Sequence, residues 1–444
     1  MRQIEKLLEW LDRGTCNFLA VDTIKKELKE AGFTELRQAD KWNIIPGAKY
    51  FMTKNDSAIF AFILGKSPVQ DCGFRIISAH SDSPCFKIKP NAEIYGDGGV
   101  VSLNVEKYGG GILYTWFDRP LSISGRVLLK GKDALHPETR LVDLRRAVCT
   151  IPHLAIHFNR GVNEGNPLSV QKDMKPVLGY FSREEIMEAI RHGGFVKKIV
   201  AEHLDISPEE IIDYELNLYP FEKASVVGVN GEYFQSARID DLSMAFAGLE
   251  AMLCECDKES EATRVLAIFD NEETGSGTKQ GAASPVLRDM MERICRGDWW
   301  GGGVHNEDIY RAIANSFMIS ADDAHAWHPN YNEKYDPTNH PVIGGGPVVK
   351  INANCKYMTD GVGAAIFRTL CQEAGVECQY FVNHSDVAGG STLGNISSSQ
   401  FDMSGVDMGN AIWAMHSARE TAGVSDHEDA IKVFRRFYQL GSIH

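Results

Sequence analysis

The sequence has no apolar run that approaches the length of about 20 residues needed to cross a lipid bilayer. It is also short of positive charge, because 46 Lys and Arg residues stand against 60 Asp and Glu residues, giving a formal net charge of -14. This deficit argues against a nucleic-acid-binding protein and against binding to acidic membranes. The ten cysteines form no Cys-x-x-Cys pair, and the nearest two are Cys254 and Cys256. We therefore expect reduced thiols in a cytoplasmic protein.

Three common catalytic signatures are also missing. Ile431 stands where the second histidine of a His-Glu-x-x-His zinc helix would follow His427 and Glu428. Neither a Gly-x-Ser-x-Gly nucleophile elbow nor a Walker-type phosphate loop occurs. Any catalytic chemistry has to come from another arrangement of side chains.

The composition is that of an ordinary globular protein. The 444 residues are 43% hydrophobic and 24% charged, and this length allows roughly two to four domain-sized units. The first residues predict an amphipathic helix rather than a signal peptide. In residues 1–91 and 233–444, strand-like apolar runs alternate with helical spacing, which predicts an α/β domain.

Residues 92–232 have a different sequence pattern, with clustered glycines and short strand-like runs. We interpret them as a β-rich domain inserted into the α/β one. Within this segment, residues 112–117 are expected to form a strand, 141–158 to be largely extended, and 183–203 to form one helix.

Two adjacent glutamates, Glu272 and Glu273, follow a predicted buried strand at 265–269 and precede a Thr-Gly-Ser-Gly turn. Ligand sites of open α/β sheets lie at this end of the strands. Adjacent carboxylates repel, and removing both from water is unfavourable unless a cation or a proton offsets their charge. Taken alone, such a pair is more often a solvated acidic turn.

Other strand-like segments end in comparable side chains. The strand at 74–79 ends at His80, with Asp82 two residues on, where a carboxylate could orient a metal-bound imidazole. Asp240 precedes a predicted helix, Asp322 follows the strand at 316–321, and His416 lies near the end of the last apolar run. Each alone reads as a polar turn or a helix cap. Their recurrence at successive strand ends favours a metal site.

The residue types indicate which metal and how many ions. Two histidines and several carboxylates, without cysteine, suit a metal of the zinc class or manganese. The carboxylates outnumber the needs of one zinc ion, and a pair of ions bridged by one carboxylate explains the surplus.

The sequence resembles the M18 family of metalloaminopeptidases, the family of aspartyl aminopeptidase. The blocks that carry the resemblance run in order through most of the chain, at residues 78–84, 108–111, 116–119, 151–157, 238–242, 270–276, 320–322, 325–331 and 414–420. Several are long and unusual in composition, for example Asp270-Asn271-Glu272-Glu273-Thr274-Gly275-Ser276.

The resemblance implies a fold and an ion pair. The fold is a zinc-exopeptidase-like α/β domain, with a mixed central sheet covered by helices on both faces, interrupted by a β-rich domain used in dimerisation. It implies two divalent ions per subunit, Zn2+ with Mn2+ or Co2+ as alternatives. The implied ligands are His80 and Asp322 for one ion, Glu273 and His416 for the other, and Asp240 as the bridge.

The resemblance also implies roles beyond the ligands. Glu272 would be the general base and Asp82 would orient His80, while His325, Lys350 and Tyr357 would contact the peptide substrate. His157 would reach a neighbouring subunit's active site, either as a substrate contact, which we prefer, or as a metal ligand. The family assembles as dimers packed into tetrahedral dodecamers.

Some alternatives stay open. Asp241 and Asp323 each follow a proposed ligand and could compete for the metal. Residues 383–392 differ from the Asn-Asp-Thr-Pro-Cys-Gly pattern of aspartate-preferring eukaryotic members and are similar to the bacterial branch, so a preference for N-terminal Asp or Glu is an open hypothesis. The same ligands would also serve a two-metal deacylase of N-acyl amino acids, or a non-catalytic metal-binding assembly protein.

Overall fold

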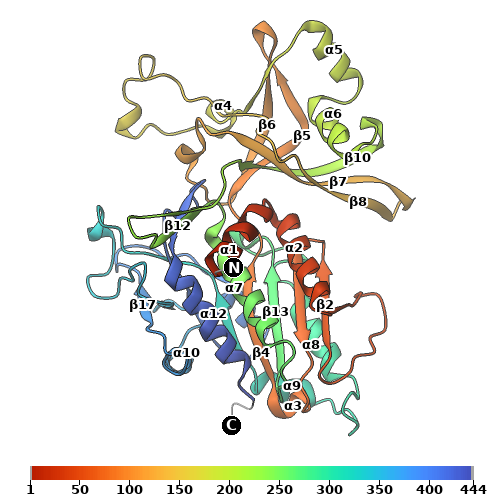
Figure 1. Cartoon of the computed structure of the whole chain (residues 1–444), viewed down its shortest axis with the longest axis vertical. Helices are drawn as coiled ribbons and strands as arrows, with labels where there is room; N and C mark the ends of the chain where they lie inside the picture. Colours follow the sequence, from red (N-terminus) through yellow and green to blue (C-terminus); the bar gives the residue numbers. More distant parts are fainter. Residues whose placement is uncertain (1–2, 442–444) are drawn as a thin grey trace. The chain divides into compact units, whose positions relative to one another are not determined.

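The chain folds into two compact units in a computed structural model that describes residues 3–441 (Figure 1). The first unit comprises Met1–Asp82, Ala224–Met415 and Glu420–His444, and the second comprises Ser83–Lys223 with His416–Arg419. The division at Ser83 and after Lys223 falls earlier than the predicted boundaries at 92 and 232. Residues 416–419, which we expected in the α/β domain, belong to the second unit.

The first unit is built on a nine-stranded mixed sheet, which confirms the predicted fold class. Its strand order is β1-β2-β3-β13-β4-β14-β18-β16-β17. The strands are β1 (Thr34–Glu35), β2 (Lys49–Lys54), β3 (Ala58–Ile63), β4 (Phe74–His80), β13 (Thr263–Phe269), β14 (Phe317–Ala321), β16 (Val348–Ile351), β17 (Gln379–Val382) and β18 (Ser404–Gly409). β13, β4, β14 and β18 run parallel to one another. β3 is antiparallel to both β2 and β13, β2 is parallel to β1, and β16 is antiparallel to β18.

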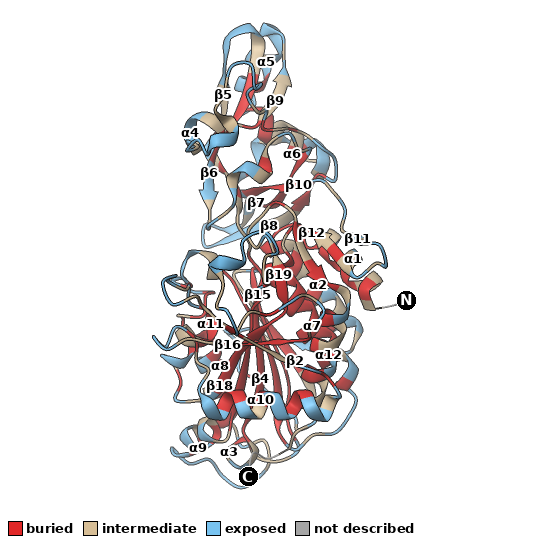
Figure 2. Cartoon of the chain, turned by 90° about the vertical axis from the view of Figure 1, so that its left-hand side faces the viewer, coloured by how far each residue is buried: buried red, intermediate tan, exposed pale blue. Residues whose placement is uncertain are grey.

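Helices cover both faces of this sheet (Figure 2). One face packs against α1 (Gln3–Arg13), α2 (Asn17–Glu30), α7 (Ile239–Glu255), α10 (Gly361–Ala374) and α12 (Val424–Tyr438). The other packs against α8 (Val286–Cys295), α9 (Asp308–Ala314) and α11 (Leu393–Ser398). The central strands are apolar throughout because successive side chains alternate between two buried faces. In β13, for example, Leu266 and Ile268 enter the first core, and Val265 and Ala267 the second.

The register of the central strands brings the predicted site residues to one edge. Phe269 of β13 pairs with His80 of β4, and Ser78 of β4 pairs with Ser320 of β14. The carboxyl ends of the three parallel strands therefore lie level, so the residues that follow them meet at the same end of the sheet.

A five-stranded sheet completes the first unit, in the order β11-β12-β20-β19-β15. Its strands are β11 (Ser225–Val227), β12 (Tyr233–Ser236), β15 (Ala324–His325), β19 (Ala411–Trp413) and β20 (Glu420–Gly423). It contributes two segments to the site region, since β12 leads into α7 and β15 follows β14.

The second unit has its own core around a six-stranded antiparallel sheet, as the predicted β-rich insertion requires. The strand order is β8-β7-β10-β5-β6-β9, from β5 (Cys85–Tyr95), β6 (Val100–Tyr108), β7 (Leu121–Asp133), β8 (His136–Asp143), β9 (Val177–Tyr180) and β10 (Ile211–Pro220). Three helices accompany it: α4 (Val170–Asp173), α5 (Arg183–Arg191) and α6 (Phe195–Leu204).

Three expectations for this unit are wrong in detail. Residues 113–116 form a 3-10 turn instead of a strand. Regular extension ends at Asp143, where β8 stops, and does not continue to 158. The helix expected over 183–203 is two helices, because Gly193 and Gly194 take positive φ values of 85° and 104° that interrupt helical geometry. Among the described residues, every helix is too short or too polar to serve as a membrane span.

Candidate metal centre

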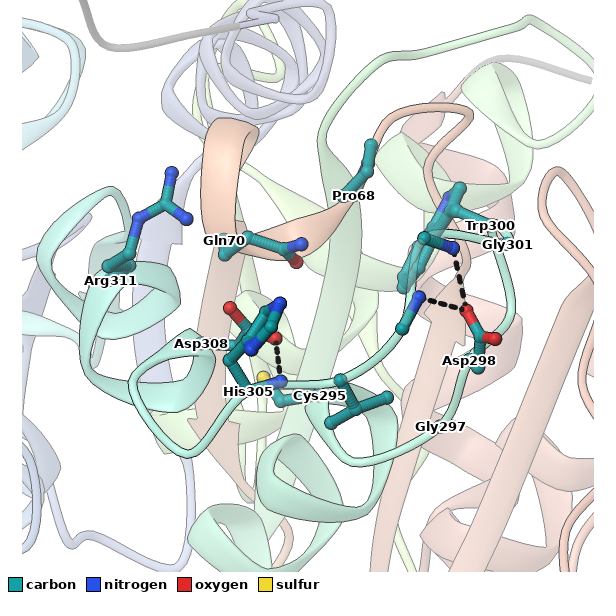
Figure 3. A pocket seen from close by; sticks show the side chains of 13 residues that line it. Pro68, Gln70, Cys295, Gly297, Asp298, Trp300, Gly301, His305, Asp308 and Arg311 are labelled. Atoms are coloured by element: carbon teal, nitrogen blue, oxygen red, sulfur yellow. Dashed lines mark hydrogen bonds between the residues drawn. The ribbon is translucent and has the colours of Figure 1, made fainter.

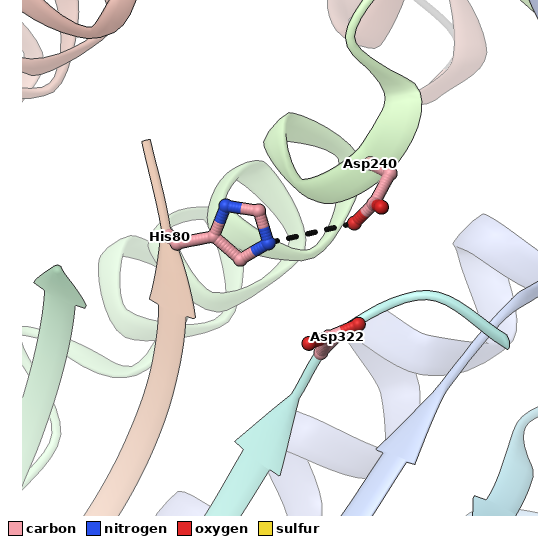
Figure 4. Close-up of side chains that lie close together, drawn as sticks. All are labelled: His80, Asp240 and Asp322. Carbon is pink, nitrogen blue, oxygen red and sulfur yellow. Dashed lines mark ion pairs between the residues drawn. The ribbon is translucent and has the colours of Figure 1, made fainter. Parts of the chain in front are cut away.

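His80, Asp240 and Asp322 converge at the carboxyl edge of the nine-stranded sheet (Figure 4). His80 is the last residue of β4, Asp240 lies at the start of α7, and Asp322 directly follows β14. One ligand atom from each lies within 4.8 Å of the other two, and His80 Nε2 is 3.5 Å from Asp240 Oδ1. All three side chains are buried. An imidazole and two carboxylates in this arrangement form a donor set that suits a zinc-class ion.

Glu272 and Glu273 approach the same imidazole from the turn after β13. Their carboxylates and His80 again place one ligand atom each within 4.8 Å of one another. The turn is a single 3-10 helix bounded by Asn271 and Gly275, both with left-handed backbone conformations. This reversal directly after the strand keeps the two glutamates at the sheet edge instead of carrying them away along a helix.

Asp82 connects this turn to His80. The two carboxylate oxygens of Asp82 accept the backbone N–H groups of Glu272, at 3.1 Å, and Glu273, at 3.2 Å. The backbone carbonyl of Asp82 lies 3.0 Å from His80 Nδ1, and its Oδ1 lies 3.4 Å from the same nitrogen. With Nδ1 donating to these oxygens, a neutral imidazole would present the lone pair of Nε2 toward Asp240, as a metal ligand requires. The predicted contact between Asp82 and His80 is present. The two hydrogen bonds that Asp82 accepts from the backbone of Glu272 and Glu273 were not predicted from the sequence.

Asp241 and Asp323, the alternative ligands, are occupied by protein donors. Asp241 Oδ2 accepts the backbone N–H of His80 at 3.0 Å. Asp323 accepts the hydroxyl of Ser243 at 2.8 Å and the backbone N–H of Asn410 at 3.2 Å. Both carboxylates nevertheless lie close to Asp240, with one oxygen of each residue within 4.8 Å of the others. We keep Asp240 and Asp322 as the proposed ligands, because these two share a cluster with His80.

Lys350 is the cation of the cluster. It lies on β16, is only 3% exposed, and its Nζ donates to Asp322 Oδ1 at 2.9 Å. Nζ also lies 5.9 Å from the centre of the Tyr357 ring. Burial lowers the pKa of Lys350, but Asp322, Tyr357 and Asp407 together outweigh it, so the pKa is raised and the ammonium stays charged.

The surrounding carboxylates raise one another's pKa. Burial raises the pKa of Glu272 to about 8; the charge of His80 opposes this and the nearby carboxylates add to it. Burial disfavours the charged imidazole of His80, but Asp241 and its other acidic neighbours outweigh burial and hold its pKa well above the ordinary value. Several buried carboxylates this close together attract protons or metal cations.

Comparison with known proteins identifies the family. The sequence matches the family described as aminopeptidase I zinc metalloprotease (M18) over residues 10–438. The chain belongs to the M18 family. It is 47% identical over 438 residues to a probable M18 family aminopeptidase 2 from Clostridium novyi, a match that covers 98% of each chain.

Solved structures agree with this assignment. In a cryo-EM structure of the Ape4 and Nbr1 complex, the matched chain is 33% identical, with a TM-score of 0.93 over 98% of this chain and 85% of that one. A chain from the dodecamer of mApe1 from S. cerevisiae is 27% identical, with a TM-score of 0.83 over 98% of this chain and 95% of that one. The protein is therefore an M18 aminopeptidase, a metallopeptidase of a zinc-dependent family.

Four further predicted site residues of this M18 chain lie outside the cluster of His80, Asp240 and Asp322. His325 is exposed at the end of β15, its ring 5.8 Å from that of Phe381. Tyr357 is 8% exposed. His416 and His157 belong to the second unit, where His416 Nδ1 lies 3.3 Å from the carbonyl of Gly110 and His157 is exposed in a loop. Their roles toward the centre stay predictions.

Two supporting contacts of the M18 centre escaped sequence reasoning. Glu420, 2% exposed, accepts the backbone N–H of Asp240 at 3.2 Å. Asn17 of α2 donates to both carboxylate oxygens of Asp270, at 3.1 Å each, immediately before the Glu272 turn. Glu420 lies inside a family-matching block, which was a usable signal. Asn17 gave none, because the contact joins residues 253 positions apart.

A separate cavity of about 270 Å³ lies near α3 (Val69–Cys72) and α9 in the first unit (Figure 3). These helices precede β4 and β14, so the cavity is at the end of the sheet opposite the metal centre. Its charged groups already have partners: Asp298 accepts the N–H groups of Gly302 and Gly303, Asp308 accepts that of His305, and Arg311 pairs with Asp71. It contains none of the predicted site residues and is a weaker candidate.

Proposed function

We propose that this chain uses two divalent metal ions, Zn2+ with Mn2+ or Co2+ as alternatives, to hydrolyse the N-terminal residue from peptides. The observation that carries the proposal is the convergence of His80, Asp240 and Asp322 beside the Glu272–Glu273 turn, at one buried edge of the sheet. Its nitrogen and oxygen donors fit the family's zinc chemistry.

The proposed ligand sets use this cluster. His80 and Asp322 hold one ion, Glu273 and His416 the other, and Asp240 bridges them. Contacts from Glu420 and Asp82 support this assignment, because they fix the backbone of Asp240 and the glutamate turn. Such supporting partners commonly change metal affinity or activity by about 10- to 100-fold when they are removed.

Bound ions would lower the pKa of a water molecule toward neutrality and polarise the scissile carbonyl. Glu272 then takes the proton of the attacking water and donates a proton to the leaving amine. Its position suits this role, because Asp82 holds its backbone while its carboxylate stays beside His80. The buried carboxylates also attract the free α-amine of the peptide, which limits cleavage to the N-terminal residue.

Lys350 links metal binding to the hypothesis of acidic specificity. Its ammonium pairs with Asp322 at 2.9 Å, and a divalent ion held by Asp322 would draw electron density from the same carboxylate. That competition would weaken the Lys350–Asp322 bond and would let the ammonium bind the side chain of an N-terminal Asp or Glu. We propose His325 and Tyr357 as further contacts of the peptide.

We further propose that the chain is a homo-oligomer, built from dimers packed into a tetrahedral dodecamer and resident in the cytoplasm. The dodecamer of the related mApe1 supports the assembly, and the absence of disulfides among the described residues agrees with a reducing compartment. His157 would complete a neighbouring active site. Mixing Glu272→Gln subunits with His157→Ala subunits should then restore some activity, whereas a mixture as inactive as its parents would refute action in trans.

The decisive experiment for the proposed function combines metal analysis with a substrate panel. Purified protein should contain two ions per subunit and release the N-terminal residue from aminoacyl-amides and peptides. Removing the metal with a chelator should abolish the activity, and restoring zinc should recover it. Preferred hydrolysis of N-acyl amino acids would instead identify a deacylase, and metal binding without hydrolysis of either class would identify a non-catalytic protein.

A further inference from the structure

Asp407 is a buried carboxylate to which the proposed mechanism gives no role. It lies on β18, which neighbours β14 and β16 in the nine-stranded sheet, and it is 0% exposed. A buried carboxylate is unfavourable unless hydrogen bonds and a counter-ion compensate its charge. The groups that compensate Asp407 come from separate segments of the first unit, and these segments adjoin the proposed peptide contacts.

Two loops donate hydrogen bonds to the Asp407 carboxylate. The backbone N–H of Met358 donates to Oδ2 at 2.6 Å, and the hydroxyl of Thr392 donates to Oδ1 at 2.5 Å. The backbone N–H of Asp407 in turn donates to the hydroxyl of Thr359 at 2.8 Å. Hydrogen bonds to an ionised acceptor are roughly twice as strong as bonds between neutral groups. The carboxylate therefore ties both loops to β18.

The backbone of α11 encloses the same carboxylate. A Cβ atom at Gly394 would lie 2.5 Å from Oδ2 and 2.6 Å from Oδ1 of Asp407. Cβ atoms do not approach other atoms this closely, so the start of α11 can reach Asp407 only because residue 394 is glycine. The carboxylate thus fills a closed space, in which a shift of either loop would break one of its hydrogen bonds.

The two loops lead to the proposed substrate contacts. Met358 directly follows Tyr357 in the loop of residues 352–360, called the Tyr357 loop, which connects β16 to α10. Thr392 is the last residue of the segment 383–392, which begins where β17 ends. Since β17 pairs with β16, both loops leave the sheet beside the strand that carries the proposed specificity cation.

That cation, Lys350, has Asp407 as a second anion. β16 is antiparallel to β18, with Val349 opposite Met408. Extending this register by one residue sets Lys350 opposite Asp407, and opposite residues of an antiparallel pair project from the same face. Burial lowers the pKa of Lys350, and the charge of Asp407 is among those, with Asp322 first, that raise it. The ammonium is therefore compensated by Asp322, at 2.9 Å, and in part by Asp407.

We propose that Asp407 is a positioning residue of the peptide site, which fixes the Tyr357 loop and the segment 383–392 against Lys350. The inference rests on the proposed aminopeptidase function, in which Lys350 and Tyr357 contact the N-terminal residue. Asp407 acts through these groups and does not touch the peptide. Because its charge is shared with the two loops, it compensates Lys350 only in part, and an acidic substrate side chain still meets an unbalanced ammonium.

Hydrogen exchange, measured by mass spectrometry on the full-length protein, tests this anchor without any assay of activity. Thr392→Val removes the hydroxyl and keeps the shape of the side chain, so it breaks one of the two bonds to the carboxylate. We expect faster exchange in residues 383–392 and also in residues 352–360, which the same carboxylate holds. Thr392→Ser should retain protection, as should Thr369→Val, a control at an exposed threonine of α10. Faster exchange confined to residues 383–392, or in neither segment, would overturn the shared anchor.

Kinetics test the consequence for the substrate. In Thr392→Val, we expect KM for an aminoacyl-amide to rise by about tenfold, the equivalent of one lost hydrogen bond to a charged group, while kcat changes much less. Thr392→Ser should restore KM, because it restores the hydroxyl. A fall in kcat at unchanged KM, or an equal loss in Thr392→Ser, would contradict a positioning role in the peptide site.

Asp407→Asn separates the charge from the anchor. The amide oxygen can accept the N–H of Met358, and the amide nitrogen can donate to the hydroxyl of Thr392, which is also an acceptor. Both loops should therefore stay protected from exchange while the negative charge is lost. Lys350 then depends more on the substrate for an anion, so the ratio of kcat/KM for acidic over neutral N-terminal residues should rise.

The comparison for this ratio is wild type and Asp402→Asn, a control at an exposed aspartate. An unchanged or lower ratio in Asp407→Asn, at unchanged metal content, would remove Asp407 from the charge balance of Lys350. If the wild-type protein hydrolyses no peptide, the proposed function fails, and the exchange experiment still decides whether Asp407 anchors the two loops.

Discussion

Replacing Asp82 with asparagine tests whether this carboxylate positions the Glu272–Glu273 turn. In the structure, each carboxylate oxygen of Asp82 accepts one backbone N–H, from Glu272 at 3.1 Å and from Glu273 at 3.2 Å. Asparagine has nearly the same shape, but its side chain offers one carbonyl oxygen and one amino group. One hydrogen bond therefore survives, and at the other position two donors face each other.

The size of the effect follows from that geometry. Losing a hydrogen bond to a charged group, with a buried donor left unsatisfied, costs about 1.5–3 kcal/mol. At about 1.4 kcal/mol for each tenfold change, this corresponds to a loss of about 10- to 100-fold in kcat/KM. Zinc affinity should fall as well, because the same turn carries the proposed ligand Glu273. The backbone carbonyl of Asp82 still accepts from His80, so the orientation of that imidazole should be retained.

The assay compares Asp82→Asn with wild type and with Asp402→Asn, a control at an exposed aspartate. kcat and KM are measured on an aminoacyl-amide at saturating zinc, and zinc affinity is measured by competition with a chelator. The expected pattern is a larger change in kcat than in KM, together with weaker zinc binding, in Asp82→Asn alone. If kcat/KM and zinc affinity both stay within about twofold of wild type, Asp82 does not position the glutamate turn.

Three further changes probe the base, the buried cation and a core histidine. Glu272→Gln should keep the metal content and the fold while lowering turnover by at least about 10²–10⁴-fold; wild-type turnover would remove Glu272 from the mechanism. Lys350→Met should reduce kcat/KM selectively for N-terminal Asp and Glu, and an equal loss on neutral residues would leave it without a role in specificity. Burial lowers the pKa of His427 to about 3. The stability that the neutral imidazole of His427 contributes to the fold is therefore complete above the unfolded pKa of about 6.5, and it falls by about 1.4 kcal/mol per pH unit below that value. The thermal midpoint of His427→Phe should therefore decrease less than that of wild type between pH 7 and pH 5, and parallel decreases would show that His427 is not the responsible group.

The sheet edge could be predicted because strand patterns and strand ends carry the information. β4, β13 and β14 are apolar on both faces, so their lengths are visible in the sequence, and parallel strands bring their carboxyl ends together. That reasoning is sufficient to place His80, Glu272 and Asp322 at one edge. It does not rank Asp240 against Asp241, since both are buried and the choice depends on which donors reach each carboxylate.

The supporting contacts could not be predicted for a related reason. Asp82 accepts a hydrogen bond from a turn 190 residues away, and Asn17 donates to Asp270 across an even longer sequence separation. Short patterns describe local geometry, and these bonds depend on how distant segments pack. In the second unit, the apolar run at 112–117 indicated a strand, but only isolated pairing is available there and the chain closes into a 3-10 turn.

The position of Lys350 connects the electrostatics of the centre to its proposed selectivity. Asp322 is the ion-pair partner that contributes most to keeping the buried ammonium on β16 charged, and Asp322 in turn lies close to Asp240 and His80. A metal ion bound by Asp322 would take over part of that compensation and leave the ammonium in need of another anion. The side chain of an acidic N-terminal residue supplies one, whereas a neutral side chain leaves the charge uncompensated. Acidic specificity would thus arise from the same charge balance that holds the metal, and it should weaken when Lys350 becomes methionine even if metal content is unchanged.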